Sequence, residues 1–170
     1  MPSAAVTRRV GPLAAVEGGQ PALAVGDIDV HHVRLSVAGL TPHLAEAPSG
    51  FVPWADVREI RLDVPTTWWP HPALGDSVGP VIEGLFGGAA IEVTETPTFP
   101  VHVRTADGAQ LEWSATTHYL SGYRRKDAAM SARLVDHLVA HPDARGLLAQ
   151  PVALLDRLAQ ILRQPPPATP

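Results

Sequence analysis

Histidines are the residues of this chain that most readily suggest chemistry, because eight are present among 170 positions. His137 and His141 stand four positions apart in a segment with helical periodicity, so their rings can share one face of a helix. Imidazole is a common zinc ligand, but a structural zinc site takes about four ligands and the sequence offers only distant third partners. We therefore expect no metal ion and no cofactor, and we interpret the histidines as surface or partly buried side chains.

A serine, a histidine and an aspartate near one another form a second candidate for chemistry. Ser114 or Ser121 could act as a nucleophile. His118 would then be its base and Asp127 the group that orients the base. The sequence lacks the nucleophile elbow and the oxyanion loop that accompany such a set, and the glycine-rich segment 84–88 lacks the Lys-Ser/Thr pair of a phosphate-binding loop. We expect no catalytic residues, and a small histidine-dependent enzyme stays open as an alternative.

Two clusters of binding-prone side chains form the candidate interaction surface. Trp68 and Trp69 are adjacent in a proline-rich segment, where one strand face cannot easily bury both rings. Arg124, Arg125 and Lys126 form a basic run directly before an expected helix. Exposed tryptophans and cations suit a partner protein or a weak contact with a membrane surface. The alternatives are that both rings fold back over the core and that the basic run is a solvated turn.

The amino-acid composition limits the classes of partner and the cellular compartments that we expect for this chain. The net charge is −4 and charged residues make up 18% of the chain, below the roughly 25% of typical soluble proteins. Residues 124–163 carry seven basic and four acidic residues, and the rest is acidic, which argues against nucleic acid as a partner. The absence of cysteine excludes disulfides and thiol chemistry and favours a cytoplasmic location. No apolar run reaches about 18 residues, so we expect no membrane-spanning helix.

Alternating apolar residues predict a β-rich region between two tails. The strongest signal is a hairpin within 101–113, where two alternating runs flank Ala106-Asp107-Gly108 and where Arg104 and Glu112 can interact across the strands. A further strand is expected at 91–94. The parity of apolar residues changes at His31-His32, which predicts a bulge or a break in the strand there.

The periodicity becomes helical after this β-region. Asp127 is a suitable N-cap for a helix that ends near His141, and a second helical piece follows Pro142. A third helix starts at Pro151. The predicted organisation is a disordered tail over residues 1–20, one domain over 21–141, a helical extension over 142–163 and a proline-rich tail over 164–170.

The order of elements and one corner motif together resemble the bacterial pleckstrin-homology-like (PH-like) domains. The motif is Val52-Pro53-Trp54-Ala55-Asp56-Val57-Arg58-Glu59-Ile60, in which a strand ends, a tryptophan anchors the corner, and a new strand leaves with its apolar residues on one face. The resemblance implies an α+β fold: a PH-like barrel of about seven antiparallel strands in two near-orthogonal sheets, capped by a C-terminal helix. The long connection 66–88 and the helices after residue 141 depart from that pattern. The fold hosts many binding roles and by itself assigns none.

The last helix should need a cover for its apolar stripe. Val152, Leu155, Leu158 and Leu162 recur at helical spacing, and each such side chain gains about 1.5–3 kcal/mol when it is buried. We expect this stripe to pack on its own domain. A homodimer formed through the same four residues is the alternative. The sequence as a whole predicts a non-catalytic binding or interaction module with an unidentified protein partner, and a weak peripheral membrane adaptor is the main rival.

Overall fold

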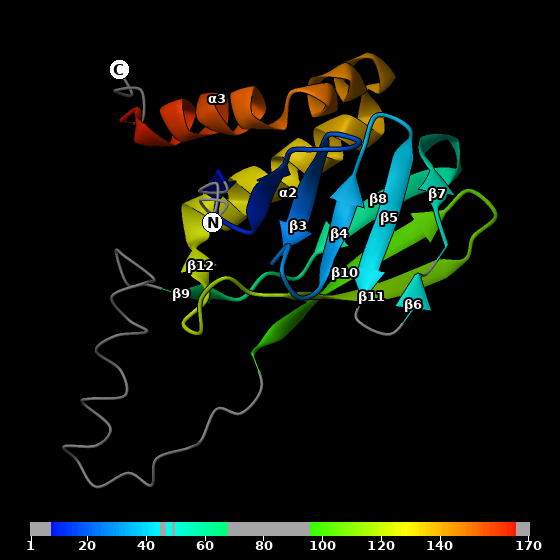
Figure 1. Cartoon of the computed structure of the whole chain (residues 1–170), viewed down its shortest axis with the longest axis horizontal. Coiled ribbons are helices and arrows are strands. Elements are labelled where there is room, and N and C mark those ends of the chain that lie inside the picture. The colour runs from blue at the N-terminus through cyan, green and yellow to red at the C-terminus, as the bar shows by residue number, and fades with distance from the viewer. Residues whose placement is uncertain (1–7, 45–46, 49, 68–95, 166–170) are drawn as a thin grey trace, which may run out of the picture.

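The computed structural model describes residues 8–44, 47–48, 50–67 and 96–165. The strand expected at 91–94, the glycine-rich segment 84–88, and the outer parts of both expected tails, 1–7 and 166–170, lie outside the described residues. Figure 1 shows two sheets packed against each other, with two long helices side by side along one end of them.

The first sheet is an antiparallel meander built from the N-terminal third of the chain. Within the described residues it has seven strands in the order β1-β2-β3-β4-β5-β6, with β7 also pairing β5. The strands are β1 (Arg9–Val10), β2 (Leu13–Val16), β3 (Ala22–Gly26), β4 (His32–Leu35), β5 (Gly39–Leu44), β6 (Ala47–Pro48) and β7 (Val52–Pro53).

A tight turn between β3 and β4 confirms the expected break at His31-His32. Residues 27–31 leave the sheet, and the Asp27 side chain accepts a hydrogen bond from the Asp29 backbone N–H at 3.0 Å. Gly26 adopts φ of +100° at the end of β3, where a Cβ would approach the His31 carbonyl oxygen to 2.8 Å. A side chain at this position would therefore be both strained and crowded.

The second sheet contains the predicted hairpin. β8 (Val57–Leu62), β10 (Thr98–Thr105) and β11 (Gln110–Thr116) pair antiparallel in the order β11-β10-β8. Val101 pairs with Trp113 and Val103 with Leu111, so the apolar residues of both strands share the core face, as predicted. The expected pair of Arg104 with Glu112 is wrong, because the register places Glu112 opposite His102. Arg104 instead contacts Glu59 at 2.6 Å on β8.

The corner at Trp54 joins the two sheets to the helices. A short 3-10 helix, η1 (Trp54–Asp56), turns the chain from β7 into β8. Trp54 is 4% exposed, and its indole Nε1 donates to the Ser36 carbonyl oxygen at 2.7 Å. The guanidinium of Arg145 lies 4.9 Å from the centre of the tryptophan ring, and its Nε donates to the Leu138 carbonyl oxygen at 2.9 Å. The predicted role of Trp54 as the anchor of this corner is confirmed.

Three helical segments follow the sheets. They are α2 (Arg125–Ala140), the 3-10 segment η2 (Pro142–Ala149) and α3 (Pro151–Arg163), and they are preceded by a short parallel pair formed by β9 (Thr66–Thr67) and β12 (Tyr123–Arg124). The expectation that Asp127 caps α2 is wrong, because the helix already begins at Arg125 and Arg124 occupies the capping position without a side-chain hydrogen bond. Asp127 lies in the first turn instead.

The apolar stripe of α3 is covered by its own chain. Leu154, Leu155 and Leu158 are buried, and Val152 and Leu162 pack partly buried against the same core. The helix contacts β1, β2 and α2. Docking on the same domain was the preferred expectation, and it is confirmed. A homodimer through this stripe stays a prediction and would require α3 to undock.

The disordered tail expected over residues 1–20 is wrong for residues 9–16, which form β1 and β2. All four residues of β2 are buried. Leu13 and Ala15 belong to the main core, whereas Ala14 and Val16 form a second cluster with Ala22 and Ala24 of β3. The domain therefore starts before residue 21, because these strands extend the first sheet.

The α+β class is confirmed by two antiparallel sheets followed by helices. The backbone of Thr116, at the end of β11, forms hydrogen bonds to both ends of the turn between β3 and β4. The Asp27 N–H donates to the Thr116 carbonyl oxygen, and the Thr116 N–H donates to the His31 carbonyl oxygen, each at 2.9 Å. These contacts join the sheets at one edge, but the sheets do not close into a barrel in the part of the chain that the structure describes.

Candidate functional site

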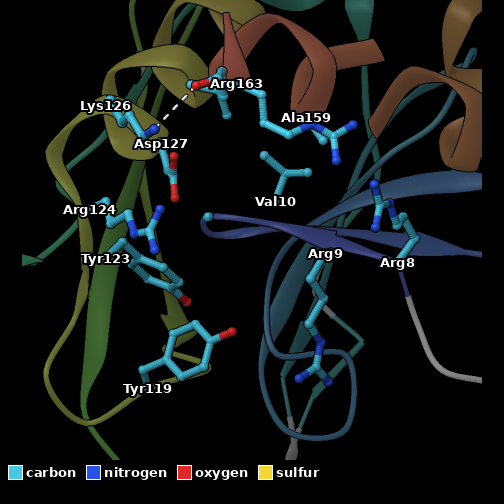
Figure 2. A pocket seen from close by; sticks show the side chains of 12 residues that line it. Arg8, Arg9, Val10, Tyr119, Tyr123, Arg124, Lys126, Asp127, Ala159 and Arg163 are labelled. Carbon is cyan, nitrogen blue, oxygen red and sulfur yellow. Dashed lines mark hydrogen bonds between the residues drawn. The ribbon is translucent and has the colours of Figure 1, made fainter. Parts of the chain in front are cut away.

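A pocket of about 380 Å³ lies where β1, the segment 119–127 and α3 meet. Figure 2 shows these three parts of the chain around one hollow, with β1 on one side, Tyr119, Tyr123 and Arg124 opposite, and Arg163 extending across from α3. The pocket falls within the roughly 300–1,000 Å³ range of small-molecule sites. It owes its existence to the docking of α3, because that helix supplies one wall.

Cationic side chains dominate the polar lining of this pocket. Arg9 belongs to β1 and Arg8 directly precedes that strand. Arg124 and Lys126 lie at the start of α2, and Arg163 lies at the end of α3. Among the residues that the structure describes, Asp127 is the single carboxylate in the lining. Since the chain as a whole is acidic, this concentration of positive charge is a local feature.

Three of these cations also contact other parts of the chain, and two of those contacts link walls of the pocket. Arg8 Nε lies 2.7 Å from the Asp156 carboxylate of α3, and Arg9 lies 4.0 Å from the Asp27 carboxylate. Lys126 Nζ donates to the Leu162 carbonyl oxygen at 3.2 Å, which links the start of α2 to the end of α3. The Arg8–Asp156 pair is about half exposed on both sides, so it contributes only about 0–1 kcal/mol.

The pKa of Asp127 is shifted by its surroundings in the pocket. Burial raises the pKa of its carboxyl group, and the neighbouring charges of Arg124 and Lys126 oppose this rise. Acidification therefore neutralises this carboxylate earlier than an ordinary aspartate and makes the pocket more positive. Gly11 permits the close approach of the β1–β2 turn, because a Cβ there would lie 3.0 Å from the Asp127 Cβ. Its φ of +55° also favours glycine.

Tyr119 and Tyr123 form the lower wall of the pocket in Figure 2, and His118 contacts Tyr123. Tyr123 accepts a hydrogen bond from the His118 backbone N–H at 2.8 Å, and its hydroxyl lies 3.0 Å from His118 Nδ1. Burial raises the pKa of the Tyr123 phenol and lowers the pKa of His118, so both groups are neutral near pH 7. The Tyr119 and Tyr123 rings meet edge to face, with centres 5.9 Å apart. This wall presents hydroxyl groups and aromatic surface without adding negative charge.

Only part of the basic run that was predicted to bind a partner lines the pocket. Arg124 and Lys126 line it, whereas Arg125 is exposed and is not part of the lining. Trp68 and Trp69, the other half of the predicted interaction surface, lie outside the described residues. Arg8, Arg9 and Arg163 were not predicted. The Arg8-Arg9 pair was visible in the sequence, but its link to positions more than a hundred residues away depends on tertiary packing.

From the sequence we expect no catalytic or metal site, and the structure places the residues that were weighed for these roles as follows. His137 and His141 stack with ring centres 4.2 Å apart, and the described residues contain no group of three or more potential metal ligands of the His, Cys, Asp and Glu types. Ser114 is exposed on β11, and His118 contacts Tyr123. Asp127 lies in the pocket lining, at the first turn of α2.

Within the described residues, no helix combines the length and the apolar character needed to cross a membrane. Comparison with family models, with curated proteins and with solved structures gave no match for this chain. The functional interpretation therefore depends on the geometry of the pocket.

Proposed function

We propose that this chain is a non-catalytic binding module of PH-like type, and that it binds an anionic ligand in the pocket between β1, the segment 119–127 and α3. The observation that carries the proposal is the lining itself, in which, among the described residues, five cationic side chains from three distant parts of the chain surround one hollow with a single carboxylate. Like charges held close together repel each other, and a bound anion relieves that repulsion.

The contacts that hold Arg8 and Arg9 are weak enough to leave room for a ligand. The exposed Arg8–Asp156 pair is weak, and the 4.0 Å separation of Arg9 from Asp27 is at the outer limit of an ion pair. The N-terminal turn of α2 also faces this region, and its backbone N–H groups carry no side-chain cap. The partial positive charge of that helix end adds to the potential made by the side chains.

The PH-like assignment has support from the order of the elements. The strands β2 to β5 form a four-stranded meander, β8, β10 and β11 form a three-stranded one, and α2 follows after the short strand β12. The tryptophan corner leads from the first group of strands to the second. The strand β1 and the helix α3 are additions to that plan, and both contribute walls to the pocket.

The non-catalytic role has support from the protonation states of Tyr123 in the lower wall and of His118, which contacts it. A neutral His118 that contacts a protonated Tyr123 can orient a ligand through the phenol, and it has no nucleophile among its hydrogen-bond partners in the described residues. A protein that carries the anion remains part of the proposal, as does a cytoplasmic location, which is favoured by the absence of cysteine.

Titration calorimetry with inorganic phosphate at constant ionic strength tests this proposal. We expect saturable binding to the full chain, and we expect Arg124→Gln and Arg163→Gln each to weaken it by about tenfold, because a charged hydrogen bond contributes about 1.5–3 kcal/mol. Arg125→Gln is the matched control, since it removes the same charge from the same run outside the pocket. Equal weakening by all three variants, or no saturable binding to the wild type, contradicts the proposal.

A further inference from the structure

The lining of the pocket joins charge to apolar surface, which bears on the class of its ligand. Besides the cations, the wall includes Val10, Ala159 and Leu162 together with the Tyr119 and Tyr123 rings. Figure 2 shows Val10 between the arginines of β1 and the helix α3. Water that fills such a site contacts apolar carbon on one part of the wall and cations on another, so a ligand with both kinds of surface displaces it most favourably.

The size of the pocket exceeds what a bare inorganic anion needs. Its volume of about 380 Å³ compares with roughly 30 Å³ for one water molecule in the liquid, so it holds on the order of a dozen waters. A phosphate ion has five heavy atoms and fills less than half of that space. Because the lining also includes apolar side chains, the remaining volume can accommodate an organic group.

The arrangement of the cations favours phosphate over carboxylate. Positive side chains line the pocket from β1 and the residue before it, from the start of α2 and from the end of α3. Figure 2 shows Arg124 and Lys126 on one side and Arg163 extending from α3, whereas the Arg9 side chain runs away from these three. A planar carboxylate presents two oxygens in one plane and matches a single guanidinium fork. A phosphomonoester presents three terminal oxygens in a pyramid and carries up to two charges, so it can contact cations from the start of α2 and from the end of α3 together.

We propose that the ligand is a phosphomonoester whose organic group is apolar or aromatic. The phosphate contacts Arg124, Lys126 and Arg163, and the organic group packs on Val10, Ala159 and the tyrosine rings. This inference rests on the proposed anion-binding function and narrows its ligand class. Such an ester can be a soluble metabolite or the headgroup of a lipid, and the two sources share the same recognition chemistry.

Three small probes test the ligand class by calorimetry on the full chain. Phenyl phosphate has both features, inorganic phosphate lacks the ring, and benzoate keeps the ring but replaces the phosphate by a carboxylate. We expect phenyl phosphate to bind at least about tenfold more tightly than either of the other two, because only it fills both parts of the lining. We further expect Arg124→Gln to weaken phenyl phosphate binding and Arg125→Gln to leave it unchanged.

Co-sedimentation separates the two sources of the ester. The probes are phosphatidylcholine vesicles with and without phosphatidic acid, a lipid phosphomonoester. Sedimentation that depends on phosphatidic acid and is lost in Arg124→Gln supports a lipid headgroup. Phenyl phosphate binding without any sedimentation supports a soluble ester.

Different results of these experiments overturn the ligand class and the proposed function. Benzoate or inorganic phosphate binding as tightly as phenyl phosphate overturns the ligand class while the anion pocket stands. If none of the three anions binds, the proposed function falls together with the ligand class.

Discussion

Replacement of Leu155 by alanine tests the docking of α3, on which the pocket depends. Leu155 is fully buried in the main core, and its helix supplies Ala159, Leu162 and Arg163 to the pocket. Buried leucine-to-alanine changes cost about 2–5 kcal/mol, because they lose apolar burial and leave a cavity. If the substitution destabilises the docked helix by about 3 kcal/mol, the equilibrium between docked and open α3 shifts by about 100-fold toward the open form.

Hydrogen exchange of the full chain, read peptide by peptide, measures this shift directly. We expect Leu155→Ala to lower the protection of the α3 amides by about 100-fold, since these hydrogen bonds exchange when the helix undocks or unfolds. Ile161→Ala is the matched control on the same helix, because Ile161 is 47% exposed. Exposed substitutions usually stay within about 0.5 kcal/mol, so protection in this variant should change less than about threefold. Similar losses in the two variants would refute the docking of α3 through its leucine stripe.

Two further predictions concern the core. Trp54→Phe should lower the free energy of unfolding by about 1–3 kcal/mol, because the Ser36 carbonyl loses its buried donor. Urea denaturation measures this change. An unchanged midpoint would show that the hydrogen bond at the corner contributes nothing to stability. His32 is 3% exposed, and burial, followed by the charges of His43 and Arg34, lowers its pKa to about 4. The unfolded chain takes up a proton at this site near pH 6.5. The contribution of His32 to stability should therefore be constant above that pH and should fall by up to about 3 kcal/mol between pH 6.5 and 4. Denaturation at pH 7.5 and 4.5 should show a smaller pH dependence in His32→Gln than in the wild type, and equal dependence in the two proteins would contradict the assignment.

The sequence predicts best those elements whose residues alternate between core and solvent. The hairpin of β10 and β11 has one buried face, one exposed face and an Asp-Gly turn, so its pattern identifies it. The strand β2 could not be recognised in this way, because both of its faces are buried. A strand covered on both sides shows a continuous apolar run, which in Leu13-Ala14-Ala15-Val16 is indistinguishable from an apolar tail.

The candidate site was predictable only in part for a related reason. The run from Arg124 to Lys126 is visible as three adjacent cations, but sequence adjacency does not show that Arg125 points away from the pocket while its neighbours line it. Arg8 and Arg163 are separated by almost the whole chain. They come together because the buried leucines of α3 place that helix against β1 and β2, which is a consequence of tertiary packing.

The most direct test of the central claim is a two-dimensional ¹H–¹⁵N NMR titration of the full chain with phenyl phosphate. The account predicts saturable shifts of backbone amides in three separate segments at once, residues 8–11, 123–127 and 159–163, because these meet only at the pocket. Shifts confined to one of these segments, or centred on the outer face of the second sheet, would contradict the claim that the cationic pocket is the binding site.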